Sequence, residues 1–88
     1  MSVPDAAASL CQSLAQVLQQ RGWMMATAES CTGGLIAAAC TDLSGSSVWF
    51  ERGFVTYSNL AKQQMLGVPE SLLIAHGAVS EPVAVAMA

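Results

Sequence analysis

Residues 28–34 of the chain, Ala-Glu-Ser-Cys-Thr-Gly-Gly, combine small, hydroxyl-bearing and flexible residues between a predicted strand and a predicted helix. The two glycines let the backbone approach a ligand closely. The first amides of a helix have no partner within the helix, and the helix dipole adds partial positive charge there. The segment therefore suits an anionic group or a developing oxyanion.

Two further polar segments carry groups for the same chemistry: Ser-Gly-Ser-Ser at residues 44–47 and Tyr-Ser-Asn-Leu-Ala-Lys at residues 57–62. A serine nucleophile needs an adjacent base. Lys62 can be that base only if burial favours its neutral amine; otherwise it is a solvated surface lysine. Ser47 and Ser30 compete as nucleophile, and each also has an ordinary interpretation, as a loop residue and as a helix cap.

Three segments, residues 28–34, 45–59 and 76–81, resemble the CinA C-terminal domain, a family whose stand-alone members are nicotinamide-nucleotide amidohydrolases. The resemblance runs from about residue 9 to residue 88. It implies an α/β fold, a layered α/β/α sandwich with helices packed on a small sheet. The family domain is longer and has a further glycine-rich loop in its second half. We therefore expect residues 1–88 to form a single domain that is truncated at its C-terminus.

The resemblance also implies an activity, the hydrolysis of nicotinamide mononucleotide to nicotinate mononucleotide and ammonia by a Ser–Lys mechanism, without a metal or other cofactor. It assigns the catalytic roles to Ser47 as nucleophile, Lys62 as base and Tyr57 as proton relay. Ser30 then becomes a substrate-binding or oxyanion residue. The expected substrate-binding residues are Ser30, Thr32, Gly33, Gly34, Gly45 and Ser46.

The alternative function is a non-catalytic nucleotide-binding or oligomerisation module. The chain is 53% hydrophobic and only 10% charged, whereas about 25% of residues are charged in an average globular protein. A domain of 88 residues has little interior in which to hide so much apolar surface. We therefore expect a homo-oligomer. Release of ammonia from the nucleotide separates the enzyme from the alternative.

The net charge of −3 and the dispersion of Arg21, Arg52 and Lys62 along the chain argue against nucleic acid as a partner. The sequence has no apolar run of about 18 residues and no signal-peptide pattern, which predicts a cytoplasmic protein without a membrane partner. Three cysteines without a Cys-x-x-Cys pair fit a reducing compartment. Together with the single histidine, His76, they make a poor set of zinc ligands.

Alternating helical and strand patterns also favour the α/β class. Strands are predicted at about residues 23–27 and 48–57, and helices at about residues 5–20, 33–43, 58–67, 69–77 and from 80 onward. In the first helix, Leu10, Leu14, Val17 and Leu18 have the spacing of one buried face. Gly53, inside the second strand, indicates a bulge or a close approach of another segment.

Overall fold

The computed structural model describes residues 4–88, and within that range the chain forms helices around a two-stranded sheet. The α/β class predicted from the sequence is confirmed. In chain order the elements are α1 (Asp5–Arg21), β1 (Met25–Ser30), α2 (Leu35–Thr41), the 3-10 helix η1 (Ser46–Val48), β2 (Phe50–Thr56), α3 (Asn59–Leu66), α4 (Glu70–His76) and α5 (Glu81–Met87).

The two strands are parallel, and α2 lies on the crossover connection that a parallel pair requires. Their register runs from Met25 opposite Phe50 to Ser30 opposite Thr56. We call the end of the sheet at Met25 and Phe50 the amino edge, and the end at Ser30 and Thr56 the carboxyl edge. Both strands reach the carboxyl edge together, so the segments that follow them start side by side.

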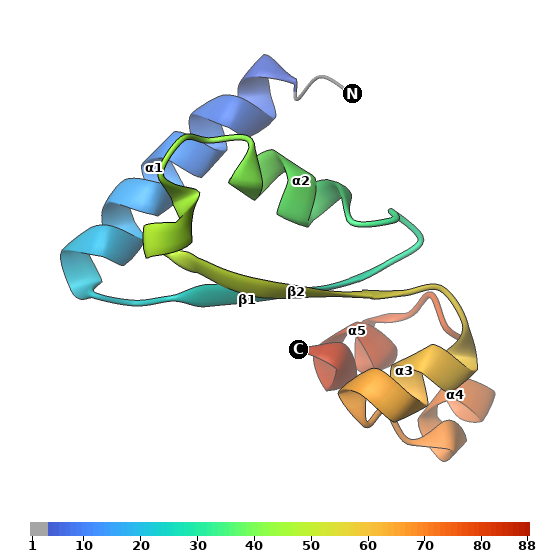
Figure 1. Ribbon diagram of the computed structural model, residues 1–88. Coiled ribbons are helices and arrows are strands. Elements are labelled where there is room, and N and C mark those ends of the chain that lie inside the picture. Colours follow the sequence, from blue (N-terminus) through green and yellow to red (C-terminus); the bar gives the residue numbers. More distant parts are fainter. Residues whose placement is uncertain (1–3) are drawn as a thin grey trace.

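The helices form two layers, with α1 and α2 on one side of the sheet and α3, α4 and α5 gathered on the other side near the carboxyl edge (Figure 1). Each layer has its own small core. The first core is made of Cys11, Ala15, Leu18, Cys40 and Trp49. The second is made of Val68, Leu73 and Val83.

The prediction of a buried face on α1 is wrong for three of its four residues. Leu18 is buried, but Leu10 is 70% exposed and Leu14 and Val17 are also exposed. The face that packs inward carries Cys11 and Ala15 instead, because small side chains let the helix come close to its neighbours. Leu10 and Leu14 line an open apolar groove of about 800 Å³, whose walls also include residues of α2.

The first strand begins and ends later than predicted. Gly22, in the left-handed conformation, ends α1, and pairing with β2 starts only at Met25. The strand then continues through Glu29 and Ser30, which the sequence pattern placed in a turn. Pairing explains the extension, since β2 runs to Thr56 and the Thr56 hydroxyl donates a hydrogen bond to the Glu29 carbonyl at 3.2 Å.

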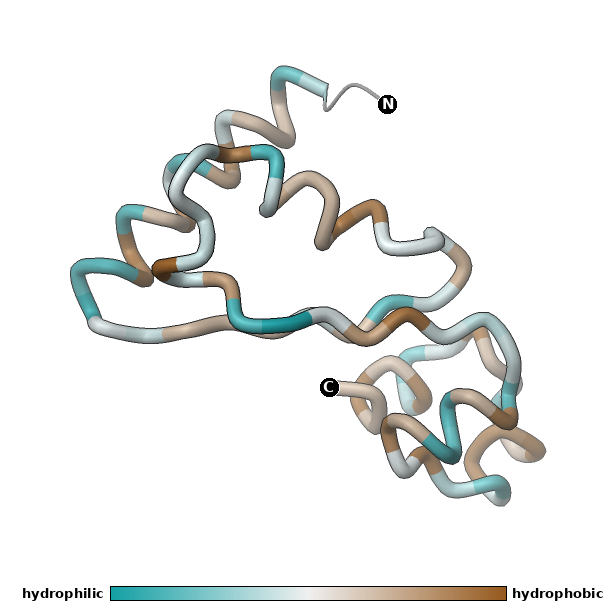
Figure 2. Tube along the Cα trace, in the orientation of Figure 1, coloured by the Kyte–Doolittle hydropathy of each residue, from teal (hydrophilic) through white to brown (hydrophobic). Residues whose placement is uncertain are grey.

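Exposed apolar side chains occur on every layer of the chain. Figure 2 shows hydrophobic positions spread along the helices rather than gathered in one interior. The exposed fraction reaches 86% for Val79, 78% for Ile74 and 51% for Ile36. Within residues 4–88, no helix is long and apolar enough to cross a membrane.

Gly53 lies where the sheet and α2 approach each other, as its position in the strand predicted. It pairs with Thr27, and a methyl group added at Gly53 would lie 2.8 Å from the Thr27 hydroxyl oxygen and 3.4 Å from the Ala37 methyl carbon. The Thr27 hydroxyl is buried and has no hydrogen-bond partner within the described residues. There is no room for a side chain at Gly53 unless Thr27 moves.

We expect Gly53→Ala to destabilise the chain by about 1–3 kcal/mol, the usual cost of overpacking. The denaturant midpoint measures this loss. The double variant Gly53→Ala with Thr27→Ala is the control, since removing the hydroxyl should recover part of the loss through coupling of the two sites. Equal midpoints for Gly53→Ala and the unaltered chain would show that Gly53 and the Thr27 hydroxyl are not in this close contact.

Candidate functional site

The carboxyl edge collects three of the residues that the sequence analysis singled out. Ser30 is the last residue of β1, Tyr57 follows the last residue of β2, and Lys62 lies in the first turns of α3. The backbone turns into α3 because the Ser58 hydroxyl accepts a hydrogen bond from the Ala61 amide at 3.0 Å, which caps the helix. Parallel pairing therefore places a serine, a phenol and a lysine on segments that leave the same edge.

Lys62 is only 2% exposed, so the interpretation as a solvated surface lysine is wrong. The ion pair formed within residues 4–88 joins Arg52 to Glu51, and no carboxylate in that range pairs with Lys62. The Lys62 side chain is therefore buried without a counter-charge within the described residues.

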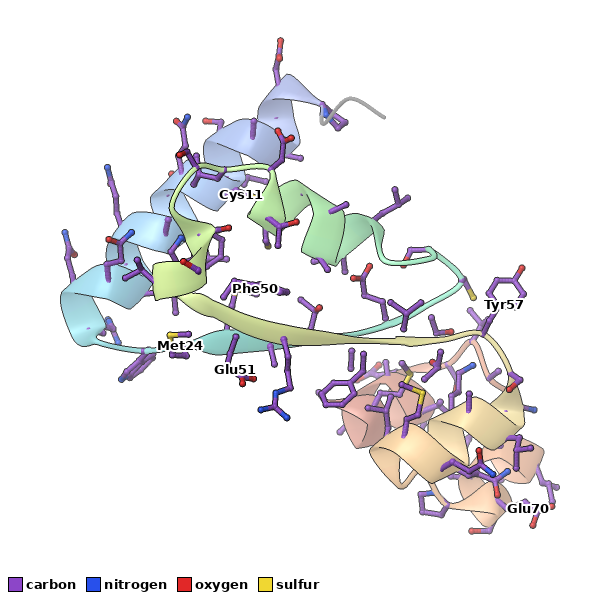
Figure 3. All side chains as sticks on the ribbon, viewed as in Figure 1. Cys11, Met24, Phe50, Glu51, Tyr57 and Glu70 are labelled. Carbon is purple, nitrogen blue, oxygen red and sulfur yellow. The ribbon has the colours of Figure 1, made fainter. Side chains whose placement is uncertain are left out.

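Tyr57 is 82% exposed. Figure 3 shows its ring projecting from the carboxyl end of β2, beyond the sheet. Its phenol is accessible to a ligand at the carboxyl edge.

The loop from Ser30 to Gly34 contains three residues with positive φ. Cys31 has a φ of 71°. Among residues 4–88 it is the only residue other than glycine with a positive φ. Gly33 and Gly34 follow with φ of 67° and 98°, a region in which glycine carries no steric penalty. The Ser30 hydroxyl lies 3.5 Å from the Cys31 thiol, and both residues face an open part of the molecule.

The Glu29 carboxylate caps the amino end of α2. Its carboxylate accepts hydrogen bonds from the Ile36 amide at 2.7 Å, the Ala37 amide at 2.9 Å and the Thr32 hydroxyl at 2.9 Å. Burial raises the pKa of the Glu29 carboxyl, but these three donors outweigh it and leave the pKa below its ordinary value. The carboxylate is therefore ionised at neutral pH.

This arrangement corrects two expectations. Ser30 does not cap α2, because the residue that precedes the helix is Gly34 and the capping group comes from Glu29. The amides of Ile36 and Ala37 are also not free for a ligand. The sequence analysis missed this role of Glu29, because the carboxylate lies seven and eight residues before the amides that it caps.

Ser47, Gly45 and Ser46 lie at the amino edge, around η1 and just before β2. The amide of Met25 donates to the Trp49 carbonyl there at 2.8 Å. At about 3.3 Å per residue, the seven residues of β2 separate the two edges by about 20 Å. Ser47 therefore lies at the opposite end of β2 from the start of α3, the helix that carries Lys62.

A cleft of about 590 Å³ opens beside the Ser30 loop. Ser30, Cys31 and Thr32 line one wall, and the start of α5, with Ser80 and Glu81, lines the other. In residues 4–88, no three His, Cys, Asp or Glu side chains gather in a way that could hold a metal ion. The polar groups of the cleft suit a small polar ligand bound by hydrogen bonds.

The chain shares extensive sequence similarity with curated bacterial proteins. It is 62% identical over 79 residues to the nicotinamide-nucleotide amidohydrolase PncC of Escherichia coli strain K12, an alignment that covers 90% of this chain and 48% of that protein. It is 61% identical over 80 residues to a putative competence-damage inducible protein of Symbiobacterium thermophilum, covering 91% of this chain and 19% of that one. The chain thus spans about half the length of the amidohydrolase relative.

The fold is similar to solved structures over its whole length. The crystal structure of the competence/damage inducible protein CihA from Agrobacterium tumefaciens matches with a TM-score of 0.94 and 48% identity, covering 100% of this chain and 54% of that one. The family model that matches residues 7–88 is the CinA C-terminal domain. The shared fold, the identity and this match together establish that the chain belongs to the CinA C-terminal domain family.

Proposed function

We propose that this chain carries catalytic residues of an enzyme that hydrolyses nicotinamide mononucleotide to nicotinate mononucleotide and ammonia. The observation that supports the proposal is the 62% identity to the Escherichia coli amidohydrolase, together with a buried Lys62 that pairs with no carboxylate among residues 4–88. Because the chain spans 48% of that relative, the proposal concerns the groups that this half contributes.

In the proposed reaction a serine hydroxyl loses its proton to Lys62, directly or through Tyr57, and its oxygen attacks the carboxamide carbon. The carbon–nitrogen bond breaks as the nitrogen takes up a proton and leaves as ammonia. Water then hydrolyses the acyl-enzyme and releases nicotinate mononucleotide. The burial of Lys62, which is 2% exposed, supports it as the base that a serine nucleophile needs beside it.

Two serines can meet Lys62 under this proposal. Ser30 leaves the same edge of the same chain as Lys62, whereas Ser47 could reach it only from a second copy, given the 20 Å length of β2 estimated from about 3.3 Å per residue. We propose Ser30 as the nucleophile. Thr32, Gly33 and Gly34 would then bind substrate beside it, while Gly45 and Ser46 would contribute only at a contact between copies.

The test uses a chimera in which this chain replaces the matching half of the Escherichia coli amidohydrolase. Ammonia and nicotinate mononucleotide are measured after addition of nicotinamide mononucleotide. We expect equimolar formation of both products. A folded chimera that releases neither product would contradict the proposed function.

We expect the 88-residue chain alone to be a poor catalyst and to self-associate. Its open apolar groove and its two-stranded sheet with unpaired edges expose surface that favours association. This exposure is also the observation that favours the alternative function, an oligomerisation module. Sedimentation of the isolated chain, together with its ammonia release, tests the expectation. A monomer that turns over as fast as the chimera would contradict it.

A further inference from the structure

The carboxylate of Glu29 takes the place of a helix cap that the local sequence does not provide. The residue before α2 is Gly34, which has no side chain with which to accept hydrogen bonds. One Glu29 oxygen accepts from the Ile36 amide and the Thr32 hydroxyl, and the other accepts from the Ala37 amide. Hydrogen bonds to an ionised acceptor are stronger than neutral ones.

The backbone of Glu29 is fixed as well as its side chain. The Thr56 hydroxyl donates to the Glu29 carbonyl at 3.2 Å, and Thr56 itself is only 1% exposed. Glu29 thereby joins the end of the sheet to the start of α2, on either side of the loop that begins at Ser30. Strained backbone, such as the positive φ of Cys31 in this loop, persists only where the surroundings hold it in place.

We propose that Glu29 is the positioning residue that sets the place of Ser30 at the carboxyl edge, and that Glu29, rather than the phosphate of a substrate, is the anion held by the start of α2. This inference rests on the proposed function, in which Ser30 acts on the substrate. A phosphate at the amides of Ile36 and Ala37 would displace a buried carboxylate and repel it at close range. The substrate phosphate therefore binds elsewhere.

The test compares Glu29→Gln with the matched control Glu51→Gln. A glutamine side chain offers one acceptor oxygen, so one of the two amides would face a donor group instead of an acceptor. Glu51 lies exposed on β2, and its carboxylate accepts hydrogen bonds from Arg52. Its substitution should therefore change nothing in the loop from Ser30 to Gly34. Amide hydrogen exchange is measured in the 88-residue chain and in the chimera, and kcat and KM in the chimera.

In Glu29→Gln we expect exchange at Ile36 and Ala37 to be faster by about tenfold to 100-fold, the scale of a lost charged hydrogen bond. Exchange at Ala38, whose amide donates to the Gly34 carbonyl, should change much less. We also expect kcat to fall about 100-fold with KM little changed, because small misplacement of a reacting group has effects of that size. Glu51→Gln should match the unaltered protein in every measurement.

Unchanged exchange at Ile36 and Ala37, or a kcat equal to that of Glu51→Gln, would overturn the inference. If Glu29→Gln unfolds, Thr32→Val replaces it in the exchange measurement alone, because Thr32 is also a proposed substrate contact. Exchange at Ile36 and Ala37 should then rise by less, since only one donor is lost. A chimera without turnover in any form would instead count against the proposed function, while the exchange measurement still reports on Glu29.

Discussion

Lys62→Met in the chimera should lower kcat/KM for nicotinamide mononucleotide by about 10²–10⁴-fold, the contribution expected of a general base. Methionine keeps the length and apolar character of the lysine stem but has no group that accepts a proton. The position is 2% exposed, so solvent offers little substitute for the missing amine. The product assay for ammonia measures the loss directly.

The stability of Lys62→Met separates a lost base from a lost fold. Lys62 has no carboxylate partner within residues 4–88, and a buried polar group without a partner costs free energy that an apolar side chain does not. The denaturant midpoint should therefore stay the same or rise while activity falls. A lower midpoint in proportion to the lost activity would indicate a structural role for Lys62.

Lys62→Arg is the complementary variant. Arginine keeps a positive charge at the position but stays protonated at every pH of interest, so it cannot act as a base. We expect it to be as inactive as Lys62→Met. Substantial turnover by Lys62→Arg would mean that Lys62 serves as a fixed positive charge, and the proposed proton transfer would then be wrong.

The α/β class, the two strands and the order of the helices followed from local patterns in the sequence. The inward face of α1 did not, because the spacing rule selects large apolar residues, whereas the helix packs through Cys11 and Ala15. The large leucines remain on an open groove. A rule based on side-chain size fails where close approach decides the packing.

In the candidate site, too, local sequence patterns predict some features, and others depend on tertiary packing. The parallel pairing, which the sequence analysis did not predict, puts Ser30 and Tyr57 at one edge, whereas Ser47 precedes β2 and lies at the other. The burial of Lys62 depends on how three helices pack beneath the sheet, which no local pattern encodes. The cap from Glu29 spans seven and eight residues along the chain, beyond the reach of capping rules for adjacent positions.

Ser30→Ala in the chimera should lower kcat by about 10⁴- to 10⁶-fold, the range observed when a serine nucleophile is removed. Ser47→Ala should leave most of the activity, since Ser47 lies at the amino edge. Mass spectrometry of the protein trapped during turnover should find the acyl group on the peptide that contains Ser30. An adduct on Ser47, with an inactive Ser47→Ala variant, would reverse the assignment.

Mixing inactive variants then distinguishes one chain from two. If Ser30 and Lys62 act within the same chain, every chain in a mixture of Ser30→Ala and Lys62→Met lacks one of them, and no activity returns. If instead Ser47 acts on a site of a second copy, Ser47→Ala and Lys62→Met complement each other, because a mixed oligomer contains one site with an intact serine and an intact lysine. Recovery of activity in either mixture therefore identifies which copies share the site.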